Sequence, residues 1–294
     1  MTSPASASAT LPGASLSRLS LGAVTLTVSD LERSLAYYQD TIGLKVLQQS
    51  EGSAVLGTSA PLLELQEEAG ATHSSPRHAG LYHFALLLPT RADLGRFVTH
   101  LIEGQRPVQG ASDHLVSEAI YFQDPDGHGI EVYADRDAAS WAWEAGQVRM
   151  GTVAADIQGI VEAAGSDRTW RGLPEGTVMG HVHLKVSDLE RTRAFYAGLL
   201  GLDVVVDMAQ QGALFVSQGG YHHHFGLNIW QSRGGAQAQD GEARLLRARV
   251  WLPEPDLKQV RARLEAGGAA PTDVAGGFEV KDPSGNVLLF GANG

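Results

Sequence analysis

The side chains able to do chemistry in this chain are histidines and carboxylates. The sequence contains 11 histidines and no cysteine, so imidazole nitrogens and carboxylate oxygens would have to hold any metal ion. His83 and Glu131 each stand within an apolar stretch, and His181 and His183 alternate along another. A carboxylate flanked by apolar residues is costly to bury without a partner. Glu131 therefore points to a buried polar site.

These residues lie in a chain that repeats itself. Val28-Ser-Asp-Leu-Glu-Arg-Ser34 returns as Val186-Ser-Asp-Leu-Glu-Arg-Thr192, and Asp124-Pro-Asp-Gly127 returns as Asp282-Pro-Ser-Gly285, both with an offset of 158 residues. Two markers that keep one spacing indicate duplicated modules. The histidines and carboxylates, however, occur at some repeat positions and are missing from their mates. This asymmetry indicates that only part of the duplicated scaffold carries the site.

Each module is predicted to contain two βαβββ units. The units open with alternating or apolar strands over residues 22–28, 81–89, 180–186 and 245–253. Ser29 with Glu32, and Ser187 with Glu190, form capping boxes that are predicted to start the first helix of each module. The Asp-Pro-Asp/Ser-Gly turns then lead into the last strands of the modules.

Composition limits the class of protein. With 43% hydrophobic and 19% charged residues, the chain is typical of a globular protein. Its formal net charge of −11 argues against a nucleic-acid partner, because phosphate binding needs clustered Lys and Arg. No apolar run approaches the roughly 20 residues of a membrane span, and the N-terminus lacks the basic and apolar segments of a signal peptide. We therefore expect a cytoplasmic protein with no membrane partner.

The repeat also predicts how the chain is divided. We expect a disordered tail over residues 1–17, a first domain over 18–136, a connector over 137–176 and a second domain over 177–294. Trp141, Trp143 and Trp170 are expected to pack the connector against a domain. The sequence leaves the oligomeric state open, a homo-oligomer included.

The repeated strings resemble those of the vicinal-oxygen-chelate superfamily, which includes glyoxalase I, bleomycin-resistance proteins and extradiol ring-cleaving dioxygenases. The resemblance rests on the Val-Ser-Asp-Leu-Glu-Arg-Ser…Tyr-Tyr…Gly-Leu and Asp-Pro-Asp-Gly-x-x-Ile-Glu strings and covers residues 18–136 and 177–292. It implies an α+β fold in which four βαβββ units form two vicinal-oxygen-chelate domains with curved mixed sheets. The chemistry stays open, because this fold hosts several unrelated reactions.

By this resemblance, metal ligands come from the first and last strands of the units. The second unit offers His83 and Glu131, and the third offers His181. The fourth unit has Arg247 and Leu289 at the positions of His83 and Glu131, so it offers none. Two histidines and one carboxylate form the facial triad of non-haem Fe(II) oxygenases. The resemblance therefore implies His83, Glu131 and His181 as metal ligands.

Two alternatives concern the ligand set. The first unit has Ala23, which cannot ligate, and Glu64, which would complete a site of the glyoxalase I type; a surface position on an edge strand is the favoured interpretation of Glu64. His183 shares a strand face with His181. His181 is preferred because it stands seven residues before Asp188, as the family's ligand does.

The order of the units raises a further question about this ligand set. Ordinary sequential pairing, first unit with second and third with fourth, would separate His181 from His83 and Glu131. We therefore expect the second and third units to share one barrel, or to meet across a subunit contact.

The resemblance also indicates residues beside the metal. In extradiol dioxygenases a histidine that precedes a short apolar strand takes part in proton transfer, and the matching position is His224. His114 belongs to a His-x-Val-Ser string of the family, and Tyr121 stands ten residues before the glutamate ligand, so both are expected to hydrogen-bond the substrate. The histidines that match no family position are expected at the surface: His73, His78, His100 and His128.

Together these residues imply an extradiol dioxygenase similar to the compact two-domain catechol 2,3-dioxygenases. Such an enzyme would use Fe(II), with Mn(II) as an alternative, and would take a small aromatic diol and O₂. One alternative is a glyoxalase-I-like lyase or isomerase that uses Glu64 or Glu131 as a base at a Ni²⁺ or Zn²⁺ site. The other is a metal-free binding protein of the bleomycin-resistance type.

Overall fold

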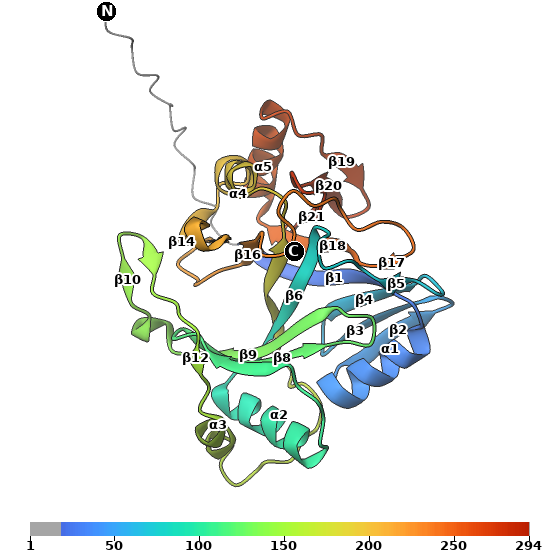
Figure 1. The fold of residues 1–294 in the computed structure, drawn as a ribbon, viewed down its shortest axis with the longest axis vertical. Helices are drawn as coiled ribbons and strands as arrows, with labels where there is room; N and C mark the ends of the chain where they lie inside the picture. Colours follow the sequence, from blue (N-terminus) through green and yellow to red (C-terminus); the bar gives the residue numbers. More distant parts are fainter. Residues whose placement is uncertain (1–18, 294) are drawn as a thin grey trace, which may run out of the picture.

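The fold consists of four βαβββ units, as the sequence predicted, arranged as two large curved sheets with helices packed around them (Figure 1). The structure is a computed structural model that describes residues 19–293. The tail expected over residues 1–17 lies outside the described residues.

The bounds of the four units are as follows. The first unit contains β1 (Ser20–Val28), α1 (Leu31–Tyr37) with its π-helical extension η1 (Tyr38–Ile42), β2 (Lys45–Ser50), β3 (Ser53–Gly57) and β4 (Pro61–Glu67). The second contains β6 (Gly80–Leu87), α2 (Arg91–Glu103), β7 (Gly110–Asp113), β8 (Ser117–Gln123) and β9 (Gly129–Asp135). The third contains β13 (Val178–Lys185), α4 (Leu189–Arg193), η3 (Ala194–Leu199), β14 (Asp203–Met208), β15 (Ala213–Ser217) and β16 (Phe225–Asn228). The fourth contains β18 (Leu245–Leu252), α5 (Glu254–Ala266), β19 (Thr272–Val274), β20 (Gly277–Lys281) and β21 (Val287–Ala292).

The units pair out of sequence order. The first and fourth units form an eight-stranded sheet with the order β19-β20-β21-β18-β1-β4-β3-β2. The second and third units, with one connector strand, form a nine-stranded sheet with the order β12-β7-β8-β9-β6-β13-β16-β15-β14. In each sheet the two opening strands lie side by side and run antiparallel, β1 with β18 and β6 with β13. The expectation that the second and third units share one barrel is confirmed, and both lie within one chain.

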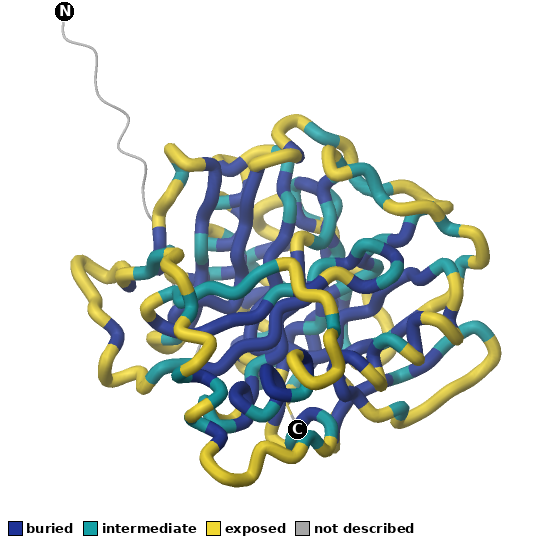
Figure 2. Tube along the Cα trace, turned by 60° about the horizontal axis from the view of Figure 1, so that its bottom comes forward, coloured by how far each residue is buried: buried dark blue, intermediate teal, exposed yellow. Residues whose placement is uncertain are grey.

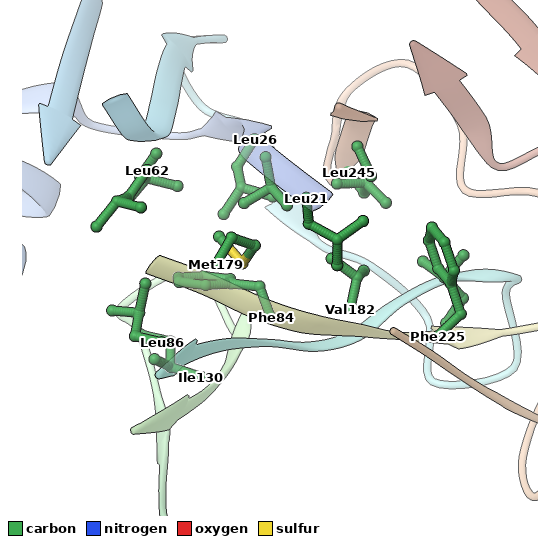
Figure 3. Close-up of a cluster of buried hydrophobic side chains, with 14 of the residues drawn as sticks. Leu21, Leu26, Leu62, Phe84, Leu86, Ile130, Met179, Val182, Phe225 and Leu245 are labelled. Carbon is green, nitrogen blue, oxygen red and sulfur yellow. The ribbon is translucent and has the colours of Figure 1, made fainter. Parts of the chain in front are cut away.

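The main core fills the space between the two sheets. Figure 3 shows its side chains meeting from both sides, with Leu21, Leu26 and Leu245 from the first sheet facing Phe84 and Val182 from the second. Buried strands form the interior and exposed residues gather in the loops (Figure 2). Because side chains alternate along a strand, burying Phe84 and Val182 in this core turns their sequence neighbours to the opposite face of the second sheet. Three of those four neighbours are histidines, His83, His181 and His183, and the fourth is Ala85.

The two repeated motifs bind each other. The Ser29 hydroxyl donates to Asp126 of the Asp-Pro-Asp-Gly turn at 2.6 Å, and the Ser29 backbone N–H donates to the same carboxylate at 3.2 Å. Arg33 adds a 2.7 Å ion pair to Asp126. In the second module, the Ser187 backbone N–H donates to Ser284 at 2.9 Å. Each pair joins one sheet to the other, since its two members lie in units of different sheets.

The predicted capping boxes were wrong by one residue. The side chain of Asp30, not Ser29, accepts the backbone N–H of Arg33 at the start of α1, and Asp188 does the same for Arg191 at the start of α4. The serines are instead used in the contacts between sheets.

The connector is structured along much of its length. It contains η2 (Ala138–Ser140), the hairpin β10 (Trp143–Glu144) and β11 (Gln147–Val148), strand β12 (Val153–Ala154), which pairs with β7, and α3 (Ile157–Ala163), which packs against α2 (Figure 1). Trp141 is buried and Trp170 lies against Phe97, as expected, whereas Trp143 is exposed. Two-residue strands β5 (Thr72–His73) and β17 (Glu242–Ala243) pair with each other. No helix in the described part of the chain is long and apolar enough to cross a membrane.

The contact between the repeated motifs can be tested by stability. Asp126→Ala removes the acceptor for three donors from Ser29 and Arg33. We expect a loss of about 1–3 kcal/mol in the free energy of unfolding, because the charged acceptor of these hydrogen bonds is lost. The matched variant at the repeat mate, Ser284→Ala, removes a neutral partner and should cost less. Urea unfolding measures both, and equal costs would contradict this account.

Candidate metal centre

Three ligand-type side chains converge on the face of the second sheet that points away from the main core. The Oε2 atom of Glu131 lies 3.1 Å from Nε2 of His83 and 3.1 Å from Nε2 of His181. The two Nε2 atoms are 3.3 Å apart. Among residues 19–293, this is the group of three histidine or acidic side chains whose ligand atoms all lie within 4.8 Å of one another. The structure thus brings together the three residues that the sequence predicted as ligands.

The strand register produces this convergence. Ala85 on β6 pairs with His181 on β13 and, on its other side, with Glu131 on β9. Neighbouring strands lie about 4.8 Å apart, so the two flanking residues stand about 10 Å apart. Their side chains meet above Ala85, whose methyl group leaves the space free. His83, two residues before Ala85, reaches the same point from β6.

The donor set fits a metal ion. Ligand atoms that share one face of a coordination shell with bonds of about 2.1 Å lie about 3 Å apart, as these three do. Two further buried atoms, Oε1 of Glu131 and Nδ1 of His181, have no hydrogen-bond partner among the described residues. A buried carboxylate oxygen without a partner is costly, and a cation at this point would offset that cost.

The protonation states also suit metal binding, which requires an ionised carboxylate and neutral imidazoles. Burial alone would raise the pKa of the Glu131 carboxyl, but the charges and hydrogen bonds of His181 and His83 hold this pKa well below its ordinary value. Burial lowers the pKa of His181, against the opposing effect of Glu131. At neutral pH the site therefore presents an anion and a neutral ring.

The three side chains line a cavity of about 1000 Å³, which is large enough for a small-molecule substrate. Part of its wall is apolar and comes from the third unit and the connector: Met150, Val206, Met208, Phe215 and Trp230. Other lining residues are polar and able to orient a ligand: Gln109, Ser112, Gln123, Lys185 and Gln231. The cavity therefore suits a ligand with both an apolar and a polar part.

Tyr121 and His114 line the same cavity and are hydrogen-bonded to each other. Nε2 of His114 lies 2.6 Å from the Tyr121 hydroxyl, and Nδ1 of His114 lies 2.8 Å from the carbonyl oxygen of Gly151 in the connector. A carbonyl can only accept, so Nδ1 carries the proton, and in the neutral ring Nε2 accepts from Tyr121. Burial, and then the charge of Glu131, raises the pKa of Tyr121. The phenol therefore stays protonated.

His224, the predicted proton carrier, does not line the cavity. Its Nδ1 lies 2.9 Å from the Ser217 hydroxyl, and burial lowers its pKa to about 3. The neighbouring His223 lines the cavity instead, with its ring centroid 4.1 Å from that of His181. The structure thus places His223, and not His224, in the cavity wall, because β16 begins only at Phe225 and the preceding residues do not follow its alternation.

His183 lies in the cavity beside the three ligand-type side chains but outside their group. The side-chain amide of Asn228 donates to its Nε2 at 3.0 Å. Its ring also occupies the space where a side chain at position 226 would point, since a Cβ on Gly226 would lie 2.7 Å from the His183 ring. These contacts make His183 a wall residue and leave His181 as the ligand candidate on β13.

The matching place in the first sheet holds an ion-pair network. Glu64 accepts the Thr25 hydroxyl at 2.7 Å, and Arg247 lies 3.8 Å from Glu64 and 3.2 Å from Glu279. Glu64 is on β4, between β1 and β3, so the edge-strand position expected for it was wrong. It lies in a different sheet from the His83 site.

One of the histidines expected at the surface is buried. His128 is 5% exposed, and its Nε2 lies 2.8 Å from the carbonyl oxygen of Thr27, so it joins the second unit to the first. His78 forms an ion-pair contact with Glu242, and His100 stacks on Trp170.

Comparisons with known proteins agree with the fold. Residues 20–132 and 178–290 match the family model described as the Glyoxalase/Bleomycin resistance protein/Dioxygenase superfamily. Over 276 residues the chain is 43% identical to a Bacillus subtilis (strain 168) protein named Catechol-2,3-dioxygenase, covering 92% of this chain and 96% of the relative. Metallothiol transferase FosB of Staphylococcus haemolyticus is 28% identical over 112 residues, covering 37% of this chain and 79% of that protein. The solved structure of glyoxalase I from Zea mays is 17% identical with a TM-score of 0.56, covering 93% of this chain and 92% of that one. This chain belongs to the Glyoxalase/Bleomycin resistance protein/Dioxygenase superfamily.

Proposed function

We propose that this protein is an extradiol ring-cleaving dioxygenase that uses Fe(II) and O₂ to open a catechol-type ring. The observation that carries the proposal is the convergence of His83, His181 and Glu131 in a cavity of substrate size. Two histidines and one carboxylate leave open positions on a non-haem iron. The 43% identity to a protein named Catechol-2,3-dioxygenase supports the same activity.

In this proposal His83, His181 and Glu131 hold the metal, with Fe(II) preferred and Mn(II) as the second choice. Bound there, Fe(II) would supply Lewis acidity, one-electron chemistry and positions for both substrate oxygens and O₂. The apolar wall formed by Phe215, Val206 and Met208 binds the aromatic ring and excludes water from it.

The remaining polar residues of the cavity orient the diol and handle its protons. The Tyr121 hydroxyl donates to His114, so the lone pairs of its oxygen are available to accept a hydrogen bond from a substrate hydroxyl. His223 lines the cavity beside His181, and burial keeps its ring neutral by lowering its pKa, so that one ring nitrogen keeps its lone pair. We therefore assign to His223 the proton-transfer role that the sequence suggested for His224.

The alternatives have less support in this geometry. A glyoxalase-type ligand set with Glu64 is not available in the chain, because Glu64 lies in the other sheet and is bound to Thr25. A metal-free binding site would leave the buried Oε1 atom of Glu131 without a partner. A Ni²⁺ or Zn²⁺ lyase that uses Glu131 as a base would lose a ligand, since Glu131 is the only carboxylate of the group.

Metal content tests the ligand set. Glu131→Gln should lower bound iron to near zero, because a neutral amide oxygen is a much weaker ligand than a carboxylate. Glu64→Gln is the matched control and should leave iron binding intact. Metal analysis of both proteins after reconstitution under reducing conditions measures the effect. If Glu64→Gln emptied the site, the glyoxalase-type ligand set would become the better account.

Oxygen uptake tests the reaction. Reduced, iron-loaded protein mixed with catechol in air should turn yellow as the ring opens to a hydroxymuconic semialdehyde, with one O₂ consumed per catechol. Protein loaded with Zn²⁺ should bind catechol without oxygen uptake, because zinc has no redox chemistry. The absence of oxygen uptake with simple and substituted catechols would refute the dioxygenase assignment and leave the fold unaffected.

Neighbouring histidines offer a paired test of proton transfer. His223→Phe should lower kcat by about 10²–10⁴-fold with iron retained, since it removes a proton carrier and no ligand. His224→Phe should cost much less activity, because His224 binds Ser217 outside the cavity. Tyr121→Phe removes one hydrogen bond and should raise the barrier by roughly 0.5–1.5 kcal/mol. A larger loss of kcat in His224→Phe than in His223→Phe would reverse the assignment.

A further inference from the structure

A chain of three side chains leads from a partly exposed carboxylate to the cavity. Oδ1 of Asp135, at the end of β9, lies 2.8 Å from Nε2 of His222. Nδ1 of His222 lies 2.7 Å from Nδ1 of His223. His222 is 0% exposed, while the Asp135 side chain is 22% exposed. His223 then lies against His181 and lines the cavity.

The direction of these hydrogen bonds follows from the chemistry of the groups. A carboxylate only accepts, so Nε2 of His222 donates to Asp135. In a neutral His222 ring, Nδ1 is then the acceptor, and the short contact to His223 requires that Nδ1 of His223 carries a proton.

The tautomer of His223 determines whether its Nε2 atom carries a lone pair or an N–H group. With the proton on Nδ1, the unprotonated atom of the neutral ring is Nε2, at the edge of the ring away from His222. Among the described residues, Nε2 of His223 has no hydrogen-bond partner, although the residue lines the cavity. A lone pair directed into the cavity can accept a proton from a bound hydroxyl, whereas an N–H group there cannot.

We propose that Asp135 and His222 are positioning residues that hold His223 in the tautomer with Nε2 unprotonated and facing the cavity. The logic is that of a catalytic triad, in which an acid orients an imidazole through a hydrogen bond to its far nitrogen. Neither Asp135 nor His222 lines the cavity or belongs to the group of ligand-type residues. The inference rests on the proposed role of His223 in the ring-cleavage reaction.

The packing around His222 indicates that the hydrogen-bonded series Asp135–His222–His223 is held rigidly. Its ring has aromatic contacts with Trp141 and Tyr221 at centroid distances of 5.1 and 4.2 Å. Tyr221 in turn lies 2.6 Å, hydroxyl to hydroxyl, from Tyr133 on β9. Contacts with the connector, with Tyr221 and through it with β9 thus hold the His222 ring in one orientation.

The first experiment reads the tautomer directly and needs no activity. In Zn²⁺-loaded protein, the ¹⁵N resonances of the His223 ring should show Nδ1 protonated and Nε2 unprotonated. His222→Phe, which keeps the aromatic packing and removes both hydrogen bonds, should give a mixture of tautomers at His223. A protonated Nε2 in the unmodified protein would overturn the proposal.

The second experiment separates positioning from a merely structural role. His222→Phe should lower kcat at least about tenfold, with KM and iron content within about twofold of the unmodified protein. Asp135→Ala should act in the same direction, and Asp135→Glu should recover part of the loss. Asp203→Ala, which removes an exposed acid on β14 of the same sheet, is the control and should leave kcat unchanged.

A double-mutant cycle closes the test. If His222 acts through His223, adding His222→Phe to His223→Phe should lower kcat no further. Losses that multiply would show an independent structural role and refute the proposal. Failure of the unmodified protein to cleave any catechol would refute the proposed function instead, and the tautomer measurement would still decide whether the chain of hydrogen bonds exists.

Discussion

The row formed by Glu131, Ala85 and His181 across three adjacent strands is the constraint on which the site depends. The outer two residues can share one ion only because the residue between them is an alanine, above which their side chains meet at 3.1 Å. That row exists only where β6 and β13 pair, so the metal centre requires the second and third units to share a sheet. The contacts of Ser29 with Asp126 and of Ser187 with Ser284 then fasten this sheet to the other one.

The first sheet has the same strand arrangement as the second but lacks its metal-ligand residues, and the comparison shows what replaces them. In the first sheet, alanine stands at the position of His181 and threonine at that of His183, and Arg247 replaces His83. Glu64 and Glu279 remain as partly buried acids, and the Arg247 guanidinium neutralises them. In the second sheet Gly226 stands where Glu64 stands in the first, because the His183 ring fills that space. In the first sheet an arginine therefore compensates the charge of the partly buried acids, whereas in the second sheet a cation site would compensate the charge of Glu131.

Much of this site could be predicted from the sequence, because the family resemblance places metal ligands on the first and last strands of the units. It implied His83, Glu131 and His181 as ligands, and the pairing of the second and third units followed from them. What could not be predicted depends on backbone outside regular strands. The family match pointed to His224, but β16 starts at Phe225 and the residues before it bend, so that His223 lines the cavity instead. The burial of His128 likewise depends on a contact with Thr27 in another unit.

Two hydrogen-bond chains end in the cavity, and both begin at an acceptor outside it. The carbonyl of Gly151 fixes His114, which accepts from the Tyr121 hydroxyl; the carboxylate of Asp135 fixes His222, which accepts from His223. In both series of hydrogen bonds each proton points away from the cavity that Tyr121 and His223 line, so the Tyr121 oxygen and, in the proposed tautomer, Nε2 of His223 keep free lone pairs. A cavity lined with acceptors beside a cation site favours a ligand that brings its own hydroxyl protons and loses them as its oxygens bind the metal. A diol has this property, whereas a ligand of carbonyl or carboxylate oxygens would leave both acceptors without a donor.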